Sequence, residues 1–138
     1  MFGTYNPVLD QKGRLTFPVK LRSSFGDRFY ITLWLDGCLA AFPETEWNAI
    51  CEKIRNLPMA QSRSLQLYLF SNAVEVEPDA QGRVLLPQNL RDAAGIDKEV
   101  VVTGVFNHAE IWDKSRWDKQ ISSISADDFA RTMAELGL

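Results

Sequence analysis

Two matching stretches of this sequence hold the residues best suited to chemistry: an aspartate followed three and four positions later by glycine and arginine. They are DQKGRLTFPVKLR at residues 10–22 and DAQGRVLLPQNLR at residues 79–91. The carboxylate can accept hydrogen bonds from the N–H groups of its own turn, and glycine allows the positive φ that such a turn requires. The arginine then begins the outgoing strand, where its planar guanidinium suits a phosphate or the O6/N7 edge of guanine. The pattern indicates two rigid loops that each present an arginine.

We interpret these loops as contacts with double-stranded DNA. The residues that we expect to make or support the contact are Asp10, Lys12, Gly13, Arg14, Asp79, Gly82 and Arg83. The arginines would contact bases and phosphates, the aspartates would brace the turns, and the glycines would permit the backbone bend. The lysine would add a phosphate contact that the second loop lacks. A plainer interpretation stays open, in which Asp10 and Arg14 form a surface or inter-subunit salt bridge that only supports the turn.

Three further basic residues follow the loops and are candidates for flanking phosphate contacts, namely Lys20, Arg22 and Arg91. For the two arginines, which we expect on short helices, the alternative is a salt bridge to an acidic neighbour. Either role would place them close to the loops in space.

Charge is unevenly distributed along the chain. The formal net charge is −3 over 138 residues, which by itself argues against a nucleic-acid partner. Residues 1–30 hold five basic and two acidic residues, a balance of +3, whereas residues 125–138 hold one basic and three acidic residues, a balance of −2. The distribution therefore matters more than the sum, because only one face has to meet the duplex.

The composition is that of a globular protein. With 46% hydrophobic and 24% charged residues, the chain can bury a core. It contains no apolar run of the roughly 18–20 residues that a bilayer span needs, and its first residues, MFGTYNPV, lack the basic and apolar segments of a secretion signal. Two cysteines are too few for a disulfide framework, so we expect a reducing cytoplasm.

The loops belong to a longer internal repeat. At an offset of 69 residues, 10–26 matches 79–95, and one extra residue then shifts the offset to 70, which aligns FPETEW with WDKSRW. Each copy is expected to contain a strand, the loop, a second strand, a short helix, a β-hairpin and a longer helix, which makes the fold class α+β. The expected divisions are a first unit at 1–58, a connecting helix at 59–73, a second unit at 74–124 and a helical tail at 125–138.

The longer helix of each unit should bury one apolar face, because its apolar residues recur every three or four positions. These faces are formed by Trp47, Ile50, Ile54 and Leu57 in the first unit and by Trp117, Ile121 and Ile124 in the second. The two tryptophans are expected to anchor the core rather than to stack on bases.

Nothing in the sequence indicates catalysis, a metal site or a cofactor. His108 is the only histidine, and we expect it in a hairpin turn. Cys38 and Cys51 lack the spacing of a metal site and are expected to pack in the core. We therefore expect no enzyme, although a catalyst that uses Cys51 or His108 stays open as an alternative.

Four segments together resemble the MraZ family of bacterial transcriptional regulators. They are MFGTYNPVLDQKGRLTFPVKLR, LDGCLAAFPETEW, DAQGRVLLPQNLR and VVVTGVFNHAEIWDKSRW, and the resemblance extends to about Trp117. It implies two tandem AbrB-like (SpoVT-AbrB) swapped-hairpin units that form a pseudo-twofold, double-psi-like β-barrel core with peripheral helices. It also implies that copies assemble into a ring and that the loops at 10–14 and 79–83 contact DNA.

The resemblance further implies a function. Family members bind short direct repeats upstream of the division and cell-wall gene cluster, usually in their own operon. We therefore expect a sequence-specific regulator that is associated with the nucleoid in the cytoplasm. Repression by occupying promoter DNA is the preferred outcome, and activation stays open as the alternative. The partners of this regulator would be double-stranded promoter DNA and further copies of itself, and several weak sites in a ring would add up along repeated DNA. The alternative is a protein-interaction or antitoxin-like module that uses its acidic tail and has no direct DNA role.

Overall fold

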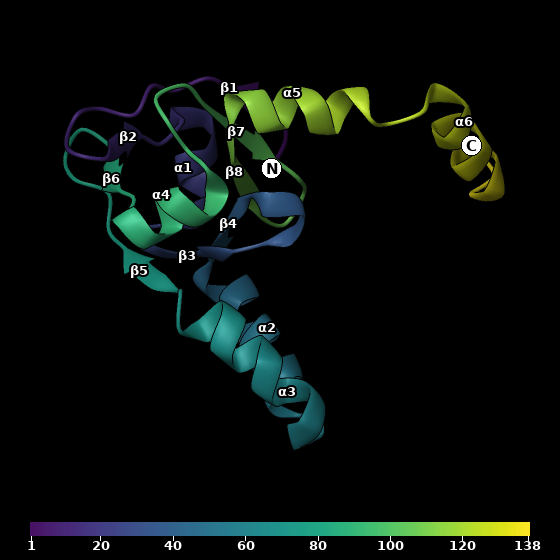
Figure 1. The fold of residues 1–138 in the computed structure, drawn as a ribbon, viewed down its shortest axis with the longest axis horizontal. Coiled ribbons are helices and arrows are strands. Elements are labelled where there is room, and N and C mark those ends of the chain that lie inside the picture. The colour runs from purple at the N-terminus through teal and green to yellow at the C-terminus, as the bar shows by residue number, and fades with distance from the viewer.

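The computed structural model describes residues 1–138 as a mixed α+β fold in which each pair of strands is followed along the chain by one or more helices (Figure 1). The strands are β1 (Thr4–Tyr5), β2 (Arg14–Thr16), β3 (Phe29–Leu33), β4 (Leu39–Pro43), β5 (Val74–Val76), β6 (Arg83–Leu85), β7 (Val100–Gly104) and β8 (Ala109–Asp113). The helices are α1 (Val19–Phe25), α2 (Glu44–Arg55), α3 (Met59–Leu65), α4 (Gln88–Ala94), α5 (Lys114–Ser122) and α6 (Ala126–Glu135), with a 3₁₀ turn η1 (Leu35–Gly37) and a π-helical turn η2 (Gln66–Phe70).

Local sequence accounts for the start of several helices. Pro18 and Pro87 stand immediately before α1 and α4, at a position where the missing N–H of proline costs no helical hydrogen bond. Ser125 caps α6, because its hydroxyl accepts a hydrogen bond from the N–H of Asp128 (3.2 Å), as the spacing of these residues predicts.

The segment between the two units, where we expect a connecting helix, has helical backbone angles at the junction residues Leu65 and Gln66. It consists of α3 followed by the π-helical turn η2. The buried hydroxyl of Thr32 on β3 donates a hydrogen bond to the carbonyl oxygen of Leu69 (2.6 Å), and this bond ties η2 to the sheet. Tertiary contact of this kind cannot be inferred from the local helical pattern.

The sheet topology interleaves the two units. All pairs are antiparallel, and the larger sheet has the order β1-β7-β8-β4-β3-β5. Strand β1 of the first unit pairs with β7 of the second, and β5 of the second unit pairs with β3 of the first, so each unit completes the sheet of the other. Strands β2 and β6, one from each unit, form a separate two-stranded ribbon. The strands thus form two sheets, and closure into a double-psi-like barrel stays a prediction.

Both units contribute to one hydrophobic core. Twenty buried residues form this cluster, and they include Leu15 of β2 and Val84 of β6. Three rings of the first unit, Phe17, Phe25 and Phe29, pack with centroid separations of 4.7 to 5.0 Å. Burial of each large apolar side chain contributes roughly 1.5–3 kcal/mol, so the ribbon is held firmly by its inner face.

The two longer helices differ in how their apolar faces are covered (Figure 1). In the first unit α3 and η2 fold back along α2, and Trp47 and Ile54 are buried. In the second unit α6 lies beyond the end of α5, and Ile121 and Ile124 are exposed. The expectation that this second apolar face is buried is therefore wrong, because the chain folds nothing back onto it. Trp117 is half-buried against Trp112.

Candidate nucleic-acid interface

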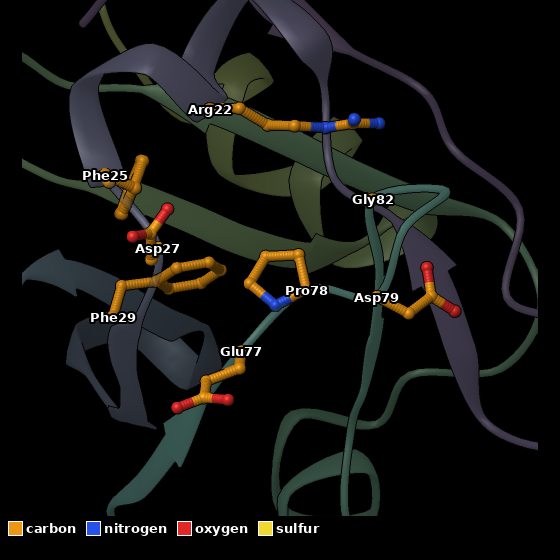
Figure 2. A pocket seen from close by; sticks show the side chains of 9 residues that line it. Arg22, Phe25, Asp27, Phe29, Glu77, Pro78, Asp79 and Gly82 are labelled. Atoms are coloured by element: carbon orange, nitrogen blue, oxygen red, sulfur yellow. The ribbon is translucent and has the colours of Figure 1, made fainter.

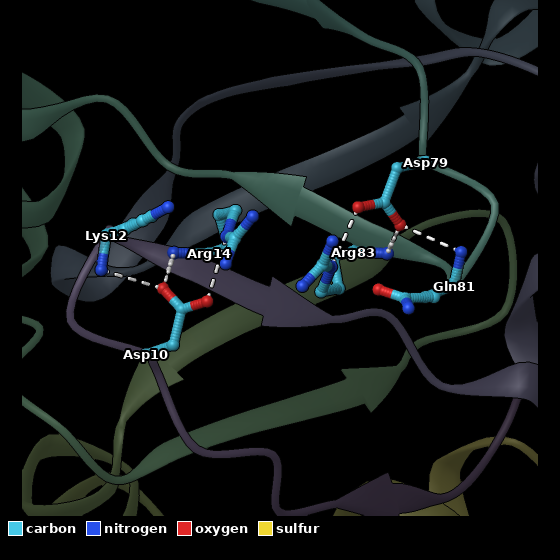
Figure 3. A network of polar contacts seen from close by, with 6 residues as sticks. All are labelled: Asp10, Lys12, Arg14, Asp79, Gln81 and Arg83. Atoms are coloured by element: carbon cyan, nitrogen blue, oxygen red, sulfur yellow. Dashed lines mark hydrogen bonds and ion pairs between the residues drawn. The ribbon is translucent and has the colours of Figure 1, made fainter.

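One carboxylate holds the first loop together. The Oδ1 atom of Asp10 accepts hydrogen bonds from the backbone N–H groups of Lys12 (2.9 Å) and Arg14 (2.8 Å). Its Oδ2 atom accepts a third from Nε of Arg14 (2.9 Å; Figure 3). The N–H of Gly13 donates to the Asp10 carbonyl oxygen (3.0 Å), and Gly13 has a φ of 81°, which favours glycine. The turn and the arginine side chain are therefore fixed to each other.

The second loop repeats these contacts at equivalent atoms. Oδ1 of Asp79 accepts from the N–H groups of Gln81 and Arg83 (both 2.9 Å), and Oδ2 accepts from Nε of Arg83 (2.7 Å; Figure 3). The N–H of Gly82 donates to the Asp79 carbonyl oxygen (2.8 Å), and Gly82 has a φ of 77°. The repeated sequence thus produces the same geometry twice.

The hydrogen bonds also lower the pKa of both aspartates. For Asp10 the main cause is the bond from the backbone N–H of Arg14, and for Asp79 it is the bond from the backbone N–H of Arg83. Bonds to the charged form stabilise it, so both carboxylates are ionised at neutral pH. Each arginine therefore stays paired with a negative charge.

The pairing leaves most of each guanidinium unused. Within the protein, the side chains of Arg14 and Arg83 donate only through Nε, and these side chains are 29% and 34% exposed. The Nη atoms keep four N–H donors per arginine for an outside acceptor. The ion pair that the plainer interpretation requires is present, yet it occupies only one of the five donors.

Strands β2 and β6 place both arginines on one face of the ribbon. Arg14 lies opposite Leu85, and Thr16 lies opposite Arg83. Because side chains alternate along a strand, these four residues share the outer face, whereas the intervening Leu15 and Val84 belong to the core. The alternation was visible in the sequences RLTF and RVLL, although our sequence analysis singled out neither Thr16 nor Leu85.

Each loop is also anchored to the strand of the other unit. The N–H of Phe17 donates to the carbonyl oxygen of Gly82 (2.8 Å), and the N–H of Leu86 donates to that of Gly13 (2.9 Å). The two loops therefore lie at opposite ends of the ribbon and cannot move independently of it.

Arg22 reaches from α1 to the second loop. Its Nε donates to the carbonyl oxygen of Phe17 (2.9 Å), and its Nη2 donates to that of Gln81 (3.3 Å). A Cβ atom built on Gly82 would overlap the Arg22 guanidinium group. The guanidinium thus occupies the space beside Gly82 that any larger residue would need.

Arg91 makes the equivalent but looser contact with the first loop. Its Nε donates to the carbonyl oxygen of Leu86 (2.9 Å), and a Cβ built on Gly13 would lie 2.9 Å from its guanidinium carbon. Neither Arg22 nor Arg91 pairs with a carboxylate, so the salt bridges that we considered for them do not form. Both bind backbone carbonyls instead, which sequence spacing could not reveal. Their use as phosphate contacts stays a prediction.

The two lysines are exposed, as a phosphate contact would require. Lys12 lies at the tip of the first loop and Lys20 on the first turn of α1. Neither forms a salt bridge or a side-chain hydrogen bond. Gln81 occupies the position in the second loop that Lys12 has in the first.

A hollow of about 380 Å³ lies beside the second loop (Figure 2). Its border includes the carboxylates of Asp27, Glu77 and Asp79 and one cation, Arg22. A phosphate would meet net negative charge there. The hollow is therefore a poor anion site, and the outer face of the ribbon is the better one.

The alternative catalytic residues are engaged in packing and in a polar network. His108 stacks on Phe42 (5.2 Å between centroids), and its Nε2 lies 3.1 Å from the Glu110 carboxylate, a larger role than the plain turn we expected. Cys38 is buried, and burial raises the pKa of both the Cys38 and Cys51 thiols. A raised pKa disfavours the reactive thiolate. No three His, Cys, Asp or Glu side chains are grouped as metal ligands, and no helix has the length and apolarity of a bilayer span.

The fold and the site define a tandem-repeat protein in which two Asp–Arg loops, each held by an ion pair, flank one two-stranded ribbon. A comparison with known protein families also finds a repeat. The sequence matches the MraZ family, described as antitoxin-like, twice, at residues 1–67 and at residues 69–137. The chain is 44% identical over 137 residues to the transcriptional regulator MraZ of Lachnoclostridium phytofermentans, with 99% of this chain and 96% of the relative covered. It is 45% identical over 139 residues to the transcriptional regulator MraZ of Clostridium beijerinckii, and the match covers 99% of this chain and 98% of that relative. The chain belongs to the MraZ family.

Proposed function

We propose that this protein is a sequence-specific DNA-binding transcriptional regulator whose contact surface is the outer face of the β2–β6 ribbon with its two loops. The main support is that Arg14 and Arg83 lie on one exposed face, each held by an aspartate and each with free Nη donors. The names of the relatives, transcriptional regulator MraZ, favour the same function.

The shape of the ribbon fits this role. The major groove of B-DNA admits a two-stranded β-ribbon, and arginine can donate two hydrogen bonds to O6 and N7 of guanine there. Residues 10–22 hold four basic residues and one acidic residue, a balance of +3, whereas residues 79–91 hold two and one, a balance of +1. Lys12, Lys20, Arg22 and Arg91 would add phosphate contacts around the ribbon, more strongly on the side of the first loop.

The wider features of the family complete the proposal. We propose that the two units of each chain form a double-psi-like barrel core and that copies of the chain assemble into a ring. The ring would bind direct repeats in the promoter of the chain's own operon and repress it. One chain with few phosphate contacts would bind weakly, and repeated contacts along repeated DNA would raise the overall affinity. The protein would act at the nucleoid in the cytoplasm, by binding rather than by catalysis.

The direct test is a titration of DNA from upstream of the chain's own gene, followed by fluorescence anisotropy. Arg14→Ala and Arg83→Ala should each weaken binding by roughly tenfold or more, because a bidentate arginine contact contributes about 1–3 kcal/mol. Arg131→Ala is the matched control, because this substitution removes the same charge at a site away from the ribbon. Arg131 lies on α6, and its side chain is 68% exposed. If both ribbon variants bind as tightly as the parent, the proposed site is wrong.

A protein-interaction role of the antitoxin-like type is the second candidate. It is favoured by the family description and by the tail, where Phe129 of α6 and Leu136, immediately after α6, are exposed. This role would be preferred if the folded wild-type protein showed no affinity for its own upstream DNA at low salt.

A further inference from the structure

We infer that Leu85 is a specificity-determining residue that contacts the C5-methyl group of a thymine, while its counterpart Thr16 offers a hydroxyl to the other end of the site. This inference rests on the proposed function, because it assigns the bases that the same ribbon face would recognise. It concerns two residues to which the sequence repeat gave no role.

Register places these residues among the arginines. Leu85 lies directly opposite Arg14, and Thr16 lies directly opposite Arg83. Side chains opposite each other in an antiparallel pair have Cβ atoms about 4.5–5.5 Å apart, and neighbouring bases along one DNA strand are about 3.4 Å apart. A base pair next to one that an arginine contacts would therefore lie within reach of Leu85 or Thr16.

Exposure shows that Leu85 is not needed to fill the core. It is 54% exposed, whereas its chain neighbours Val84 and Leu86 are 2% and 0% exposed. Its partly covered edge borders a shallow hollow with Val74 and Pro87. A single exposed leucine on a protein surface is ordinary. Leu85 lies beside the free Nη groups of both arginines, and it is the one large apolar side chain that the outer face of the ribbon offers to a base edge.

The chemistry of the groove selects thymine for this contact. In the major groove thymine alone among the four bases presents a methyl group, and apolar side chains are its usual partners. Leu85 has no hydrogen-bonding atom in its side chain, so its preference can only come from such an apolar contact. Thr16 has one methyl group, which can also contact a thymine methyl, and a hydroxyl that can donate to or accept from several base edges or a phosphate. It therefore discriminates less sharply than Leu85.

The pair also breaks the symmetry of the site. Positions 16 and 85 are equivalent in the repeat, at the same offset of 69 that relates Arg14 to Arg83. Two identical halves would bind a site equally well in either orientation. A methyl-selective half and a hydroxyl-bearing half give the chain a preferred direction along the duplex, which suits DNA repeated head to tail.

The experiment replaces thymine by uracil, position by position, in the upstream DNA bound by the full-length protein. This exchange removes only the methyl group. For the wild type, one position in each site should lose roughly fourfold in affinity, which corresponds to about 0.8 kcal/mol for one buried methyl-sized group. Leu85→Ala should bind thymine and uracil DNA equally at that position, and Thr16→Val should keep the difference.

Thr16→Leu supplies a gain-of-contact control, because it should create a second uracil-sensitive position at the other end of the site. Thermal unfolding of each variant shows whether the fold is kept, which is expected at exposed positions. If uracil has the same effect on the wild type and on Leu85→Ala at every position, while Arg14→Ala still weakens binding, the inference is wrong and the proposed function stands. If Arg14→Ala and Arg83→Ala have no effect either, the proposed function itself fails.

Discussion

The two Asp–Arg loops have the same internal bonds but different surroundings. Each aspartate accepts two backbone N–H groups and one arginine Nε, at distances that differ by at most 0.2 Å between the loops. Outside the loops the symmetry ends. Lys12 in the first corresponds to Gln81 in the second, and Arg22 holds the second loop more tightly than Arg91 holds the first. The shared hydrogen bonds indicate that both loops have the same function. The differences indicate that the first loop contributes more to phosphate binding, whereas the second is held more tightly to the fold.

The largest loss of DNA affinity should come from replacing the planar guanidinium groups of the arginines while keeping their positive charge. Arg14→Lys and Arg83→Lys should each lose nearly as much affinity as the alanine variants, roughly tenfold per arginine contact, because lysine cannot donate a planar pair of bonds or be held by aspartate in the same way. Anisotropy titrations at constant salt measure this loss. Recovery of full affinity by lysine would mean that the loops supply charge alone.

The next comparison concerns the glycines and their arginine neighbours. Gly82→Ala should lower the free energy of unfolding by about 1–3 kcal/mol, from backbone strain at positive φ, and should also displace Arg22. Gly13→Ala should cost less, because the Arg91 guanidinium lies farther away. Thermal unfolding measures both.

A double-mutant cycle separates these two causes. In an Arg22→Ala background the excess cost of Gly82→Ala over Gly13→Ala should disappear. An excess of unchanged size would show that the close contact between Arg22 and the second loop has no energetic consequence.

Replacing the aspartates that hold the two arginines should have a smaller effect on DNA binding. In Asp10→Asn or Asp79→Asn, Oδ1 can still accept the turn N–H groups, but the new amide cannot accept from arginine Nε. We expect severalfold weaker binding, less than for loss of the arginine itself. Equal losses for Asp→Asn and Arg→Ala would imply that the aspartate is the more important partner.

The same aspartates make a pH prediction. Their pKa values are lowered from 3.8 in the folded protein, so their stabilising contribution is fully present above that pH and is lost as pH falls through the lowered values. The stability difference between wild type and Asp79→Asn should therefore be constant from pH 8 to pH 5 and shrink only in strong acid. Denaturant unfolding across this range measures it, and a difference that changes near neutrality would contradict the assignment.

The smallest effect should come from the lysine that distinguishes the loops. Lys12→Gln should make the first loop resemble the second, reducing the slope of log affinity against log salt by about 0.9 for each lost phosphate contact. Gln81→Lys should raise the slope by a similar amount. These changes should be uniform across DNA sequences, and a sequence-dependent change would mean that Lys12 contacts bases.

The sequence predicted what depends on short-range chemistry. The loops, the hairpins and the Ser125 cap follow from turn residues and strand patterns within a few positions. It could not predict that β1 pairs with β7, because this pairing joins residues about 99 positions apart. Nor could it show that Arg22 and Arg91 cross to the loop of the other unit. The periodic apolar face of α5 was found, but periodicity does not supply the partner that would bury it.

The contact of Arg14 and Arg83 with guanine is tested by combining the arginine variants with 7-deazaguanine, which lacks the N7 acceptor. Each guanine of the bound DNA is replaced in turn, and affinity is measured for wild type, Arg14→Ala and Arg83→Ala. One replacement should weaken binding by the wild type but have no further effect on Arg14→Ala, and a different replacement should behave likewise with Arg83→Ala. If every replacement weakens the variants as much as the wild type, the arginines do not contact guanine and the central claim is wrong.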